Sequence, residues 1–260
     1  MNETPLKTKP MGKTQLQLKA SEDNGLIDLT LPVKLFSWNV MGSNYCKLEL
    51  DHTARIKSQL EFLQTIDADI IFLQEVDQHF RSAYDSHDLS KHFHTYSSDV
   101  TPYGQMILSK HATSYEVYSI GKNSDKKIVV LSLKIDGQTT YFANCHLQAG
   151  RYNTAQRASQ VSKIVTLLKS KNPAGLNFIL GDLNMDSEAE LIEGYNDLCP
   201  ENDRELYTFN HVANYITATQ QSSHRFDRFY CSAKIDVDYD VMTHIVLSDH
   251  FPMTLVVNRV

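Results

Sequence analysis

The sequence NFILGDLN occupies residues 177–184 and contains the transition that is most informative about the fold. A run of apolar residues ends at Gly181, and a carboxylate and an amide, Asp182 and Asn184, follow within three positions. Such a run, preceded by a turn-forming segment, predicts a buried β-strand. If the chain stays extended, Asp182 and Asn184 point to the same side, because strand residues two apart share a face. A turn formed by these two side chains is the alternative.

Four other apolar runs end in the same way, with polar residues where a strand should give way to a loop. These residues are Asn39, Glu75, His146, and the pair Asp249 and His250. Strand ends suit catalytic groups because the sheet fixes the backbone while the side chain opens into a cleft. Taken singly, each has a plain structural explanation, such as a solvated carboxylate at Glu75. The repetition therefore carries the prediction of one shared site.

Two amphipathic helices are predicted over residues 55–65 and 155–170, where apolar residues recur at helical spacing. Ser187 and Glu190 indicate a short helix after the strand at 177–180. Further strands are predicted at 34–39, 69–73, 104–108, 127–135, 139–145, 226–232 and 243–247. More strand than helix, in mixed order, indicates the α/β class, with sheets packed face to face in an α/β sandwich and helices outside.

Composition places the chain among ordinary globular proteins, with 42% hydrophobic and 22% charged residues. We expect a flexible extension at residues 1–31, followed by one domain over residues 32–260. The longest apolar runs are far shorter than the roughly 20 residues that span a bilayer, so no integral membrane association is expected. The N-terminal residues lack the apolar segment of a Sec-type signal, which predicts a cytoplasmic protein, although secretion by another route stays open.

The charge balance restricts how this chain can recognise phosphate. The 25 Lys and Arg residues against 31 Asp and Glu residues give a net charge of −6. Such a chain lacks the broad positive field of many nucleic-acid-binding proteins, so phosphate recognition must be built locally. The candidate carboxylates favour Mg²⁺ or Mn²⁺ over Zn²⁺. The irregularly spaced histidines that would suggest zinc, in a segment typical of a surface loop, are His79, His87, His92 and His94.

Six short motifs occur in an order that resembles the endonuclease/exonuclease/phosphatase superfamily. They are SWNV at 37–40, LQEV at 73–76, HL at 146–147, GDLN at 181–184, RFDR at 225–228 and SDH at 248–250. The resemblance extends over most of the chain, from about residue 35 to residue 256. It implies a four-layered α/β sandwich, in which two mixed β-sheets are flanked by helices and the active site lies at one edge.

The resemblance also implies a divalent-metal site. Glu75 is similar to the principal metal ligand of the family. Asn39 corresponds to a residue beside the metal that acts as a ligand, orients its neighbours or binds the phosphate. Asp249 resembles an additional carboxylate of the metal and its water network. The cofactor implied is Mg²⁺ or Mn²⁺.

The catalytic residues implied by the resemblance surround this metal. Asp182 and Asn184 resemble the pair that positions or deprotonates the attacking water and holds the scissile phosphate. His250 is similar to the imidazole that stabilises charge on the phosphate, and Asp227 to the acid that fixes its tautomer. His146 resembles a second phosphate-binding imidazole. Together these roles describe in-line attack of water on a phosphodiester.

Within the superfamily, the chain most resembles the tyrosyl-DNA phosphodiesterases of the second type, which cut a 5′-phosphotyrosyl bond. The RFDR motif and the segments HLQAGR at 146–151 and YTF at 207–209 carry this resemblance. It implies that Arg151 and Arg157 lie near the phosphate, whose geometry suits a guanidinium; solvent-facing helix arginines are the alternative. The chain departs from the group at Met41, where Asp is usual, and at Gln148, where an acidic residue is common.

The sequence therefore predicts a Mg²⁺- or Mn²⁺-dependent phosphodiesterase, a hydrolase of nuclease type. We expect a monomer that acts on nucleic acid or a nucleic-acid adduct, as in DNA repair. The first alternative is a phospholipid or inositol phosphate hydrolase, of sphingomyelinase or 5-phosphatase type, which shares every core motif. The second alternative is a catalytically silent scaffold of the same fold, in which Met41 in place of the usual Asp would be the first sign of lost activity. Without a broad basic face, the protein should recognise a strand end or adduct in preference to long duplex.

Overall fold

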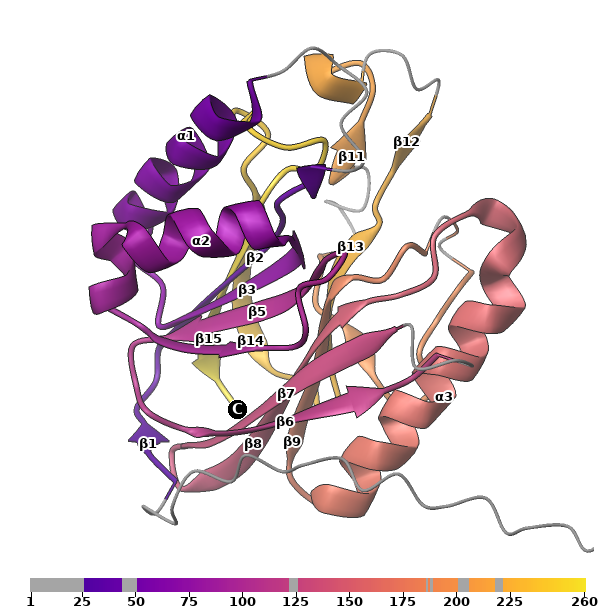
Figure 1. Ribbon diagram of the computed structural model, residues 1–260. Coiled ribbons are helices and arrows are strands. Elements are labelled where there is room, and N and C mark those ends of the chain that lie inside the picture. Colours follow the sequence, from indigo (N-terminus) through magenta and orange to yellow (C-terminus); the bar gives the residue numbers. More distant parts are fainter. Residues whose placement is uncertain are drawn as a thin grey trace, which may run out of the picture.

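The computed structural model describes residues 26–43, 51–121, 126–185, 187, 189–200, 206–217 and 222–260. Their strands form two large mixed sheets that face each other across a common core (Figure 1). The first sheet has six strands in the order β14-β15-β2-β3-β5-β4. These strands are β2 (Val33–Asn39), β3 (Ile70–Val76), β4 (His94–Ser97), β5 (Gly104–Ser109), β14 (Asp236–Val241) and β15 (Met253–Arg259).

The second sheet has seven strands in the order β1-β7-β8-β9-β13-β10, with β6 also paired to β7. These strands are β1 (Asp28–Leu29), β6 (Ser114–Ser119), β7 (Lys127–Ile135), β8 (Gln138–His146), β9 (Leu176–Asp182), β10 (Asn196–Asp197) and β13 (Asp227–Cys231). A small separate pair consists of β11 (Phe209–Asn210) and β12 (Ser223–His224). Because β2 runs parallel to β3 and β8 runs parallel to β9, the carboxyl ends of each pair lie side by side.

Helices cover the outer faces of both sheets (Figure 1). α1 (His52–Thr65) and α2 (Gln78–Ser86) pack on the six-stranded sheet, and α3 (Thr154–Lys171) packs on the seven-stranded sheet. Short 3₁₀ turns lie at Asp88–Lys91, Arg151–Asn153 and Tyr215–Thr217. Within the described ranges, no helix combines the length and apolar character that crossing a membrane requires.

The hydrophobic core is divided into three clusters that correspond to the spaces between four layers. The central cluster lies between the sheets and includes Phe142 and Phe178, whose rings stack at a centroid distance of 4.7 Å. A second cluster joins α1 and α2 to the outer face of one sheet through residues such as Leu60 and Phe80. A third joins α3 to the other sheet, with Ile164 at its centre. The predicted four-layered α/β sandwich is confirmed.

Two predicted elements are wrong. Residues 243–247, predicted as a strand, form turns between β14 and β15, and Ile245 and Leu247 pack against the α1 cluster. The segment is therefore apolar because it packs against this cluster, and not because it is part of a sheet. The described residues around Ser187 and Glu190 contain no helix, and the carboxylate of Glu190 is paired with Arg157.

One helix, α2, is not evident from the sequence. Its buried side chains are Phe80 and Tyr84, one turn apart in an otherwise polar segment, which is too few to establish a helical period. The side chain of Asp77, directly before the helix, accepts a hydrogen bond from the backbone N–H of Phe80. This cap starts the helix immediately after β3.

The ordered sheet begins before the expected domain boundary at residue 32. β1 pairs with β7 in parallel, with Asp28 opposite Lys134 and Leu29 opposite Ile135. Leu29 is buried in the central cluster. Residues 28–29 therefore belong to the folded domain, which corrects the boundary. The rest of the expected extension, up to residue 25, lies outside the described residues.

Candidate active site

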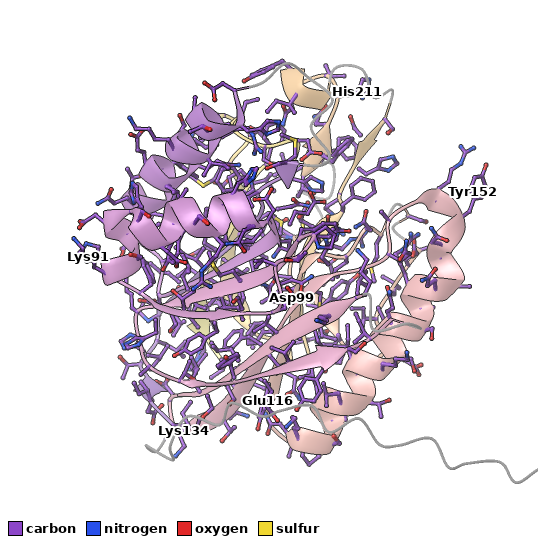
Figure 2. All side chains as sticks on the ribbon, in the orientation of Figure 1. Lys91, Asp99, Glu116, Lys134, Tyr152 and His211 are labelled. Carbon is purple, nitrogen blue, oxygen red and sulfur yellow. The ribbon has the colours of Figure 1, made fainter. Side chains whose placement is uncertain are left out.

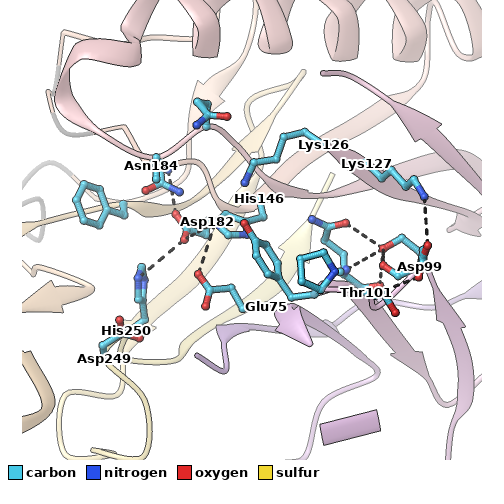
Figure 3. Close-up of a pocket in the computed structure, with 18 of the residues that line it drawn as sticks. Glu75, Asp99, Thr101, Lys126, Lys127, His146, Asp182, Asn184, Asp249 and His250 are labelled. Carbon is cyan, nitrogen blue, oxygen red and sulfur yellow. Dashed lines mark hydrogen bonds and ion pairs between the residues drawn. The ribbon is translucent and has the colours of Figure 1, made fainter. Parts of the chain in front are cut away.

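The polar residues at the strand ends meet at one edge of the sandwich. β2 and β3 carry Asn39 and Glu75 from one sheet, and β8 and β9 deliver His146 and Asp182 from the other. β13 begins at the same edge with Asp227, in register with Asp182 of β9. They line a cleft of about 630 Å³. Figure 3 shows side chains of its lining, which include Glu75, His146, Asp182, Asn184, Asp249 and His250.

Asp182 lies at the centre of this polar cluster. Its Oδ2 accepts a hydrogen bond from Asn39 Nδ2 at 2.9 Å and lies 3.6 Å from His146 Nε2 and 3.9 Å from His250 Nε2. Its Oδ1 accepts a hydrogen bond from the backbone N–H of Asn184 at 2.9 Å. The carboxylate is thus oriented by groups from both sheets.

Gly181 explains why the motif around Asp182 starts with a glycine. Its φ is +107°, and a Cβ at this position would lie 2.5 Å from the carbonyl oxygen of Cys145 and 2.8 Å from Gln74 Nε2. A side chain would therefore clash with the backbone of β8 and with a buried amide. The glycine allows the end of β9 to lie close to its neighbours while the chain turns into the cleft.

Glu75 is the carboxylate whose surroundings best fit a cation. Its φ is +57°, an uncommon value outside glycine, and its Oε2 accepts a hydrogen bond from the backbone N–H of Gly42 at 3.0 Å. Burial, followed by the negative charge of Asp249, raises the pKa of Glu75 to about 7. A divalent cation would relieve this cost, and ligand atoms of Glu75, His146 and Asp182 lie within 4.8 Å of one another. These two carboxylates and one imidazole form a group that could hold a metal ion.

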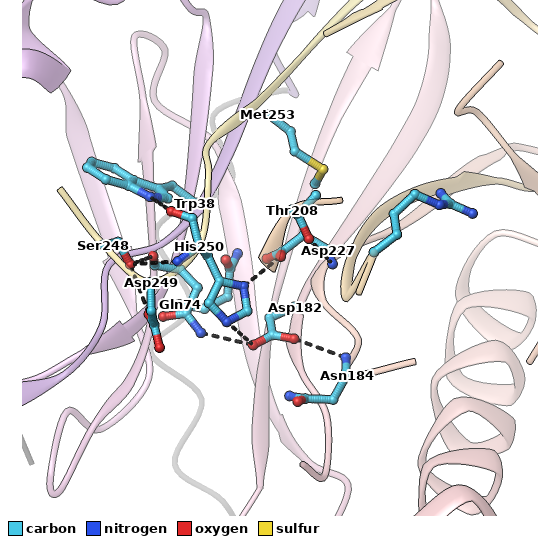
Figure 4. A network of polar contacts seen from close by, with 12 residues as sticks. Trp38, Gln74, Asp182, Asn184, Thr208, Asp227, Ser248, Asp249, His250 and Met253 are labelled. Atoms are coloured by element: carbon cyan, nitrogen blue, oxygen red, sulfur yellow. Dashed lines mark hydrogen bonds and ion pairs between the residues drawn. The ribbon is translucent and has the colours of Figure 1, made fainter. Parts of the chain in front are cut away.

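His250 is held as a charged hydrogen-bond donor. Its Nδ1 lies 2.7 Å from Asp227 Oδ2, and its carbonyl oxygen accepts a hydrogen bond from Trp38 Nε1 at 2.9 Å (Figure 4). Burial alone would lower the pKa of His250, but the negative charges of Asp227 and Asp182 outweigh burial and raise this pKa well above its usual value. The imidazole is therefore protonated at neutral pH and offers a cationic donor to an anion in the cleft.

His146 has the opposite protonation state. It is buried, and burial together with the nearby charge of Lys126 lowers the pKa of His146 to about 3. Its contacts at 3.7 Å with Glu75 and 3.6 Å with Asp182 are therefore those of a neutral ring and not ion pairs. Its Nδ1 has no hydrogen-bond partner among the residues that the structure describes. The cleft thus combines one neutral and one charged imidazole.

The profile of the Endonuclease/Exonuclease/phosphatase family matches residues 36–250, which contain every motif that builds this cleft. The chain belongs to this family. The membership expected from the six ordered motifs is therefore confirmed, and the cleft lies at the sandwich edge where the family's active site is expected.

Solved structures with the endonuclease/exonuclease/phosphatase fold include TDP2 proteins, as the sequence resemblance predicted. Truncated TDP2 from Caenorhabditis elegans is 23% identical, with a TM-score of 0.72, and the alignment covers 88% of this chain and 98% of that one. TDP2 from D. rerio, complexed with a single-strand DNA product, is 18% identical, with a TM-score of 0.72 and coverage of 87% and 98%.

A third relative of the same fold is the catalytic domain of human Nocturnin with a bound sulfate anion. It is 16% identical, with a TM-score of 0.67 and coverage of 91% of this chain and 97% of that one. At these identities the likeness establishes the fold. A comparison with curated protein sequences gives no significant match.

Arg157 is buried in the interior of the protein and does not line the cleft. It is fully buried on α3, where its Nε and Nη2 donate to the two carboxylate oxygens of Glu190, each at 2.8 Å. Its Nη1 donates to the carbonyl oxygens of Gln148 and Gly150 at 3.2 and 2.8 Å. This internal ion pair holds the guanidinium of Arg157 away from the residues that line the cleft, so the structure does not support the expected contact of Arg157 with the substrate phosphate.

Arg151 is also placed away from the cleft. It is exposed at the start of α3, with its guanidinium 4.7 Å from the ring centroid of Tyr152 and hydrogen-bonded to the Tyr152 hydroxyl. Figure 2 shows Tyr152 projecting outward at this corner of the molecule. On this loop the residues that line the cleft stop at Ala149, so Arg151 is not part of the cleft lining.

Asn39 and Met41 are buried next to the cleft and do not line it. Asn39 Nδ2 donates to Asp182 and its Oδ1 accepts from the backbone N–H of Met41 at 3.0 Å, so this amide orients Asp182. Met41 is buried with a φ of +57°, and its carbonyl oxygen accepts a hydrogen bond from Arg55 at 2.8 Å. The position at which the tyrosyl-DNA phosphodiesterases of the second type usually carry Asp is therefore a buried apolar one in this chain.

Tyr103 and Lys126 line the cleft although no motif predicts them. The Tyr103 ring lies 5.5 Å from the His146 ring, and Lys126 Nζ lies 5.6 Å from the centroid of Tyr103. The turn signal of Pro102 and Gly104 around Tyr103 is the only hint in the sequence. Nothing local distinguishes Lys126 from a surface lysine.

Two phenylalanines near His250 also line the cleft. The rings of Phe209 and Phe226 lie 5.4 and 6.1 Å from the His250 ring. Phe209 also forms an isolated β-bridge with His250, which brings β11 to this edge. Both residues stand in the YTF and RFDR segments, but the sequence assigned them no role in the site.

Proposed function

We propose that this protein is a divalent-metal-dependent phosphodiesterase that hydrolyses a phosphodiester bond in nucleic acid or a nucleic-acid adduct. The observation that carries the proposal is that one cleft brings the carboxylates of Glu75, Asp182 and Asp249 together with His250, whose Nδ1 lies 2.7 Å from Asp227 Oδ2. A cation site beside a cationic donor suits the charge that develops on a phosphate during hydrolysis. Membership of the family supports the same reaction class.

The residues of the cleft divide the chemistry among them. A bound Mg²⁺ or Mn²⁺ would supply positive charge to the phosphate oxygens, and Glu75 and Asp249 would hold it. Asp182, oriented by Asn39, orients the attacking water and accepts its proton. His250 donates from Nε2 to a non-bridging phosphate oxygen while Asp227 keeps the ring protonated and aligned.

Asn184 and His146 complete this arrangement from the seven-stranded sheet. Asn184 lines the cleft with its backbone N–H bonded to Asp182, so its position is tied to that of the carboxylate. We assign it to phosphate binding. The neutral ring of His146 lines the cleft, with its Nε2 3.7 Å from Glu75 and 3.6 Å from Asp182, and we assign it as a second phosphate-facing imidazole.

The substrate that we propose is a strand end or a 5′-phosphotyrosyl adduct. Tyr103 and Lys126 place an aromatic ring and an ammonium group beside His146, which suits an aromatic leaving group. Phe209 and Phe226 offer apolar faces beside His250, which suit a base. The net charge of −6 supplies no broad field for long duplex. The single-strand DNA product in the D. rerio relative supports this substrate class.

A substrate panel tests the proposed function. With Mg²⁺, we expect the purified protein to release tyrosine from a 5′-phosphotyrosyl oligonucleotide faster than it cuts plain single-stranded DNA or RNA. Chelation by EDTA should abolish release, and Asp182→Asn is the inactive control. Metal-dependent release confined to sphingomyelin vesicles or inositol phosphates would instead identify a lipid or inositol phosphate hydrolase. Absence of both Mg²⁺ binding and hydrolysis would identify a silent scaffold.

Tyr103→Ala tests the assigned leaving group. We expect kcat/KM for the 5′-phosphotyrosyl oligonucleotide to fall about ten-fold, because the aromatic contact is lost. The matched substrate is the same oligonucleotide with a 5′-phosphomethyl ester, whose kcat/KM should fall by less than about two-fold. Tyr103→Phe keeps the ring and should behave like wild type on both. Equal losses on the two substrates would refute recognition of the aromatic group.

A further inference from the structure

Arg228, the second arginine of the RFDR motif, has no role in the proposed reaction, yet it is fully buried. It follows Asp227 on β13, and adjacent strand residues face opposite sides of a sheet. Asp227 points to His250 at the cleft, so Arg228 points to the side away from it. Burial of a guanidinium is costly unless its donors are satisfied. The groups that satisfy it therefore indicate what this residue does.

The hydrogen bonds of Arg228 connect two segments that both supply residues to the cleft. Its acceptors are the carbonyl oxygens of Met185 (3.3 Å), Ser187 (3.3 Å) and Arg225 (3.1 Å) and the hydroxyl of Tyr230 (3.3 Å). The first two belong to the chain that leaves the cleft directly after Asn184. The last two belong to β13 and the residues that enter it. One side chain thus spans the end of β9 and the start of β13.

Asp227 depends on this external support because its own side chain has few anchors. Its Oδ2 bonds to His250 Nδ1, whereas its buried Oδ1 has no partner among the described residues. Its backbone N–H donates to Thr208 Oγ1 at 3.1 Å, and its strand pairs with β9 so that Asp227 lies opposite Asp182. The direction of the carboxylate is therefore set by the backbone of β13 (Figure 4).

The first arginine of the motif stabilises the same region. Arg225 is buried and forms a two-pronged pair with Asp197 of β10, at 3.2 and 2.6 Å. Arg228 Nη1 lies 3.7 Å from the same Asp197. The two arginines that flank Phe226 and Asp227 thus share one carboxylate on the neighbouring strand.

We infer that Arg228 is a positioning residue: it ties the segment after Asn184 to the strand that carries Asp227. This holds the Asp182 side of the cleft and the Asp227–His250 pair in a fixed relation. The inference rests on the proposed function, because the geometry that it maintains is that of the proposed reaction. A displacement of about 1 Å in such a geometry can cost on the order of a hundred-fold in rate.

Kinetic comparison of three variants tests the inference. Arg228→Met should lower kcat by about ten- to a hundred-fold while KM changes by less than about three-fold. Arg228→Lys keeps a positively charged donor group and should recover part of kcat. If Arg228→Met does not fold, Arg228→Lys takes its place in the comparison with wild type. The control is Leu63→Ala, a fully buried change on α1, which lowers stability but should leave kcat of the folded enzyme within about two-fold.

A nuclear magnetic resonance measurement tests the inference independently of activity. The ring N–H that His250 shares with Asp227 should give a far-downfield proton signal, assigned by its loss in Asp227→Asn. We expect the signal in wild type and in Leu63→Ala, and its loss or displacement in Arg228→Met. An unchanged signal, together with a kcat no lower than that of Leu63→Ala, would overturn the inference. If wild type hydrolyses nothing in the panel, the proposed function fails and the signal alone decides the role of Arg228.

Discussion

Glu75→Gln is expected to lower Mg²⁺-dependent hydrolysis by about a thousand-fold or more, equivalent to about 4 kcal/mol of transition-state stabilisation. The substitution keeps the shape of the side chain and removes the charge of a carboxylate that lines the cleft with Asp249. Because the amide is a poor ligand for Mg²⁺, the cation site should be weakened at its principal member. The measurement is the initial rate with the best substrate of the panel over a range of Mg²⁺ concentrations.

The same substitution is expected to stabilise the metal-free protein. Burial and the charge of Asp249 raise the pKa of Glu75 from 4.5 to about 7. Between these two values the carboxyl group is ionised in the unfolded chain but still protonated in the folded one, so metal-free wild type should lose stability as pH rises from one to the other. Glu75→Gln should lack this loss. Thermal unfolding across pH, with and without Mg²⁺, measures both effects.

Glu61→Gln is the matched control for Glu75→Gln. Glu61 is exposed on α1, 3.7 Å from Lys57, so its substitution should change neither activity nor the response to Mg²⁺. Mg²⁺ should raise the unfolding temperature of wild type and Glu61→Gln but not of Glu75→Gln. The metal-ligand role is contradicted if Glu75→Gln keeps more than about a tenth of the activity or responds to Mg²⁺ like wild type.

Arg157→Met is expected to lower the free energy of unfolding by about 3–5 kcal/mol. The guanidinium is fully buried and donates to both carboxylate oxygens of Glu190 and to the carbonyl oxygens of Gln148 and Gly150. Removing the guanidinium leaves the largely buried carboxylate of Glu190 without a cation. It also removes a hydrogen-bond donor from the carbonyl oxygens of Gln148 and Gly150. Urea-induced unfolding, followed by circular dichroism, measures the loss.

Two comparisons separate this internal role from a surface role. Arg157→Met combined with Glu190→Leu removes both charges, so it should be more stable than Arg157→Met alone. Arg151→Met removes the exposed arginine that was also expected at the phosphate, and it should change stability by less than about 0.5 kcal/mol. If Arg157→Met were no less stable than Arg151→Met, the buried ion pair would not hold α3 to the loop at Glu190.

The location of the site is readable from the sequence because strand ends follow simple rules. Short apolar runs followed by polar residues mark the points where strands end, and parallel pairing brings two such ends to one edge. Glu75, His146 and Asp182 lie together for this reason. A single apolar run does not identify a family, but the order of the six motifs did.

Other features depend on contacts between distant segments. As part of an amphipathic helix, Arg157 is expected at the surface or at a phosphate, but Glu190, from a loop after β9, holds it inside. Residues 243–247 have the composition of a strand, yet β14 and β15 pair with each other and leave them as the connection. Lys126 reaches the cleft because its position before β7 brings it near Tyr103 and His146. The sequence around Lys126 does not indicate this proximity.

The residues that stand at the strand ends can be read from the chain, because hydrophobic periodicity is a local property. Their charge states depend on how the two sheets pack. His146 and His250 line the same cleft, but Asp227 lies 2.7 Å from one ring, whereas burial and Lys126 act on the other. The result is one protonated and one neutral imidazole. Protonation depends on burial and on distances to charges through space, and those exist only once the two sheets have packed together.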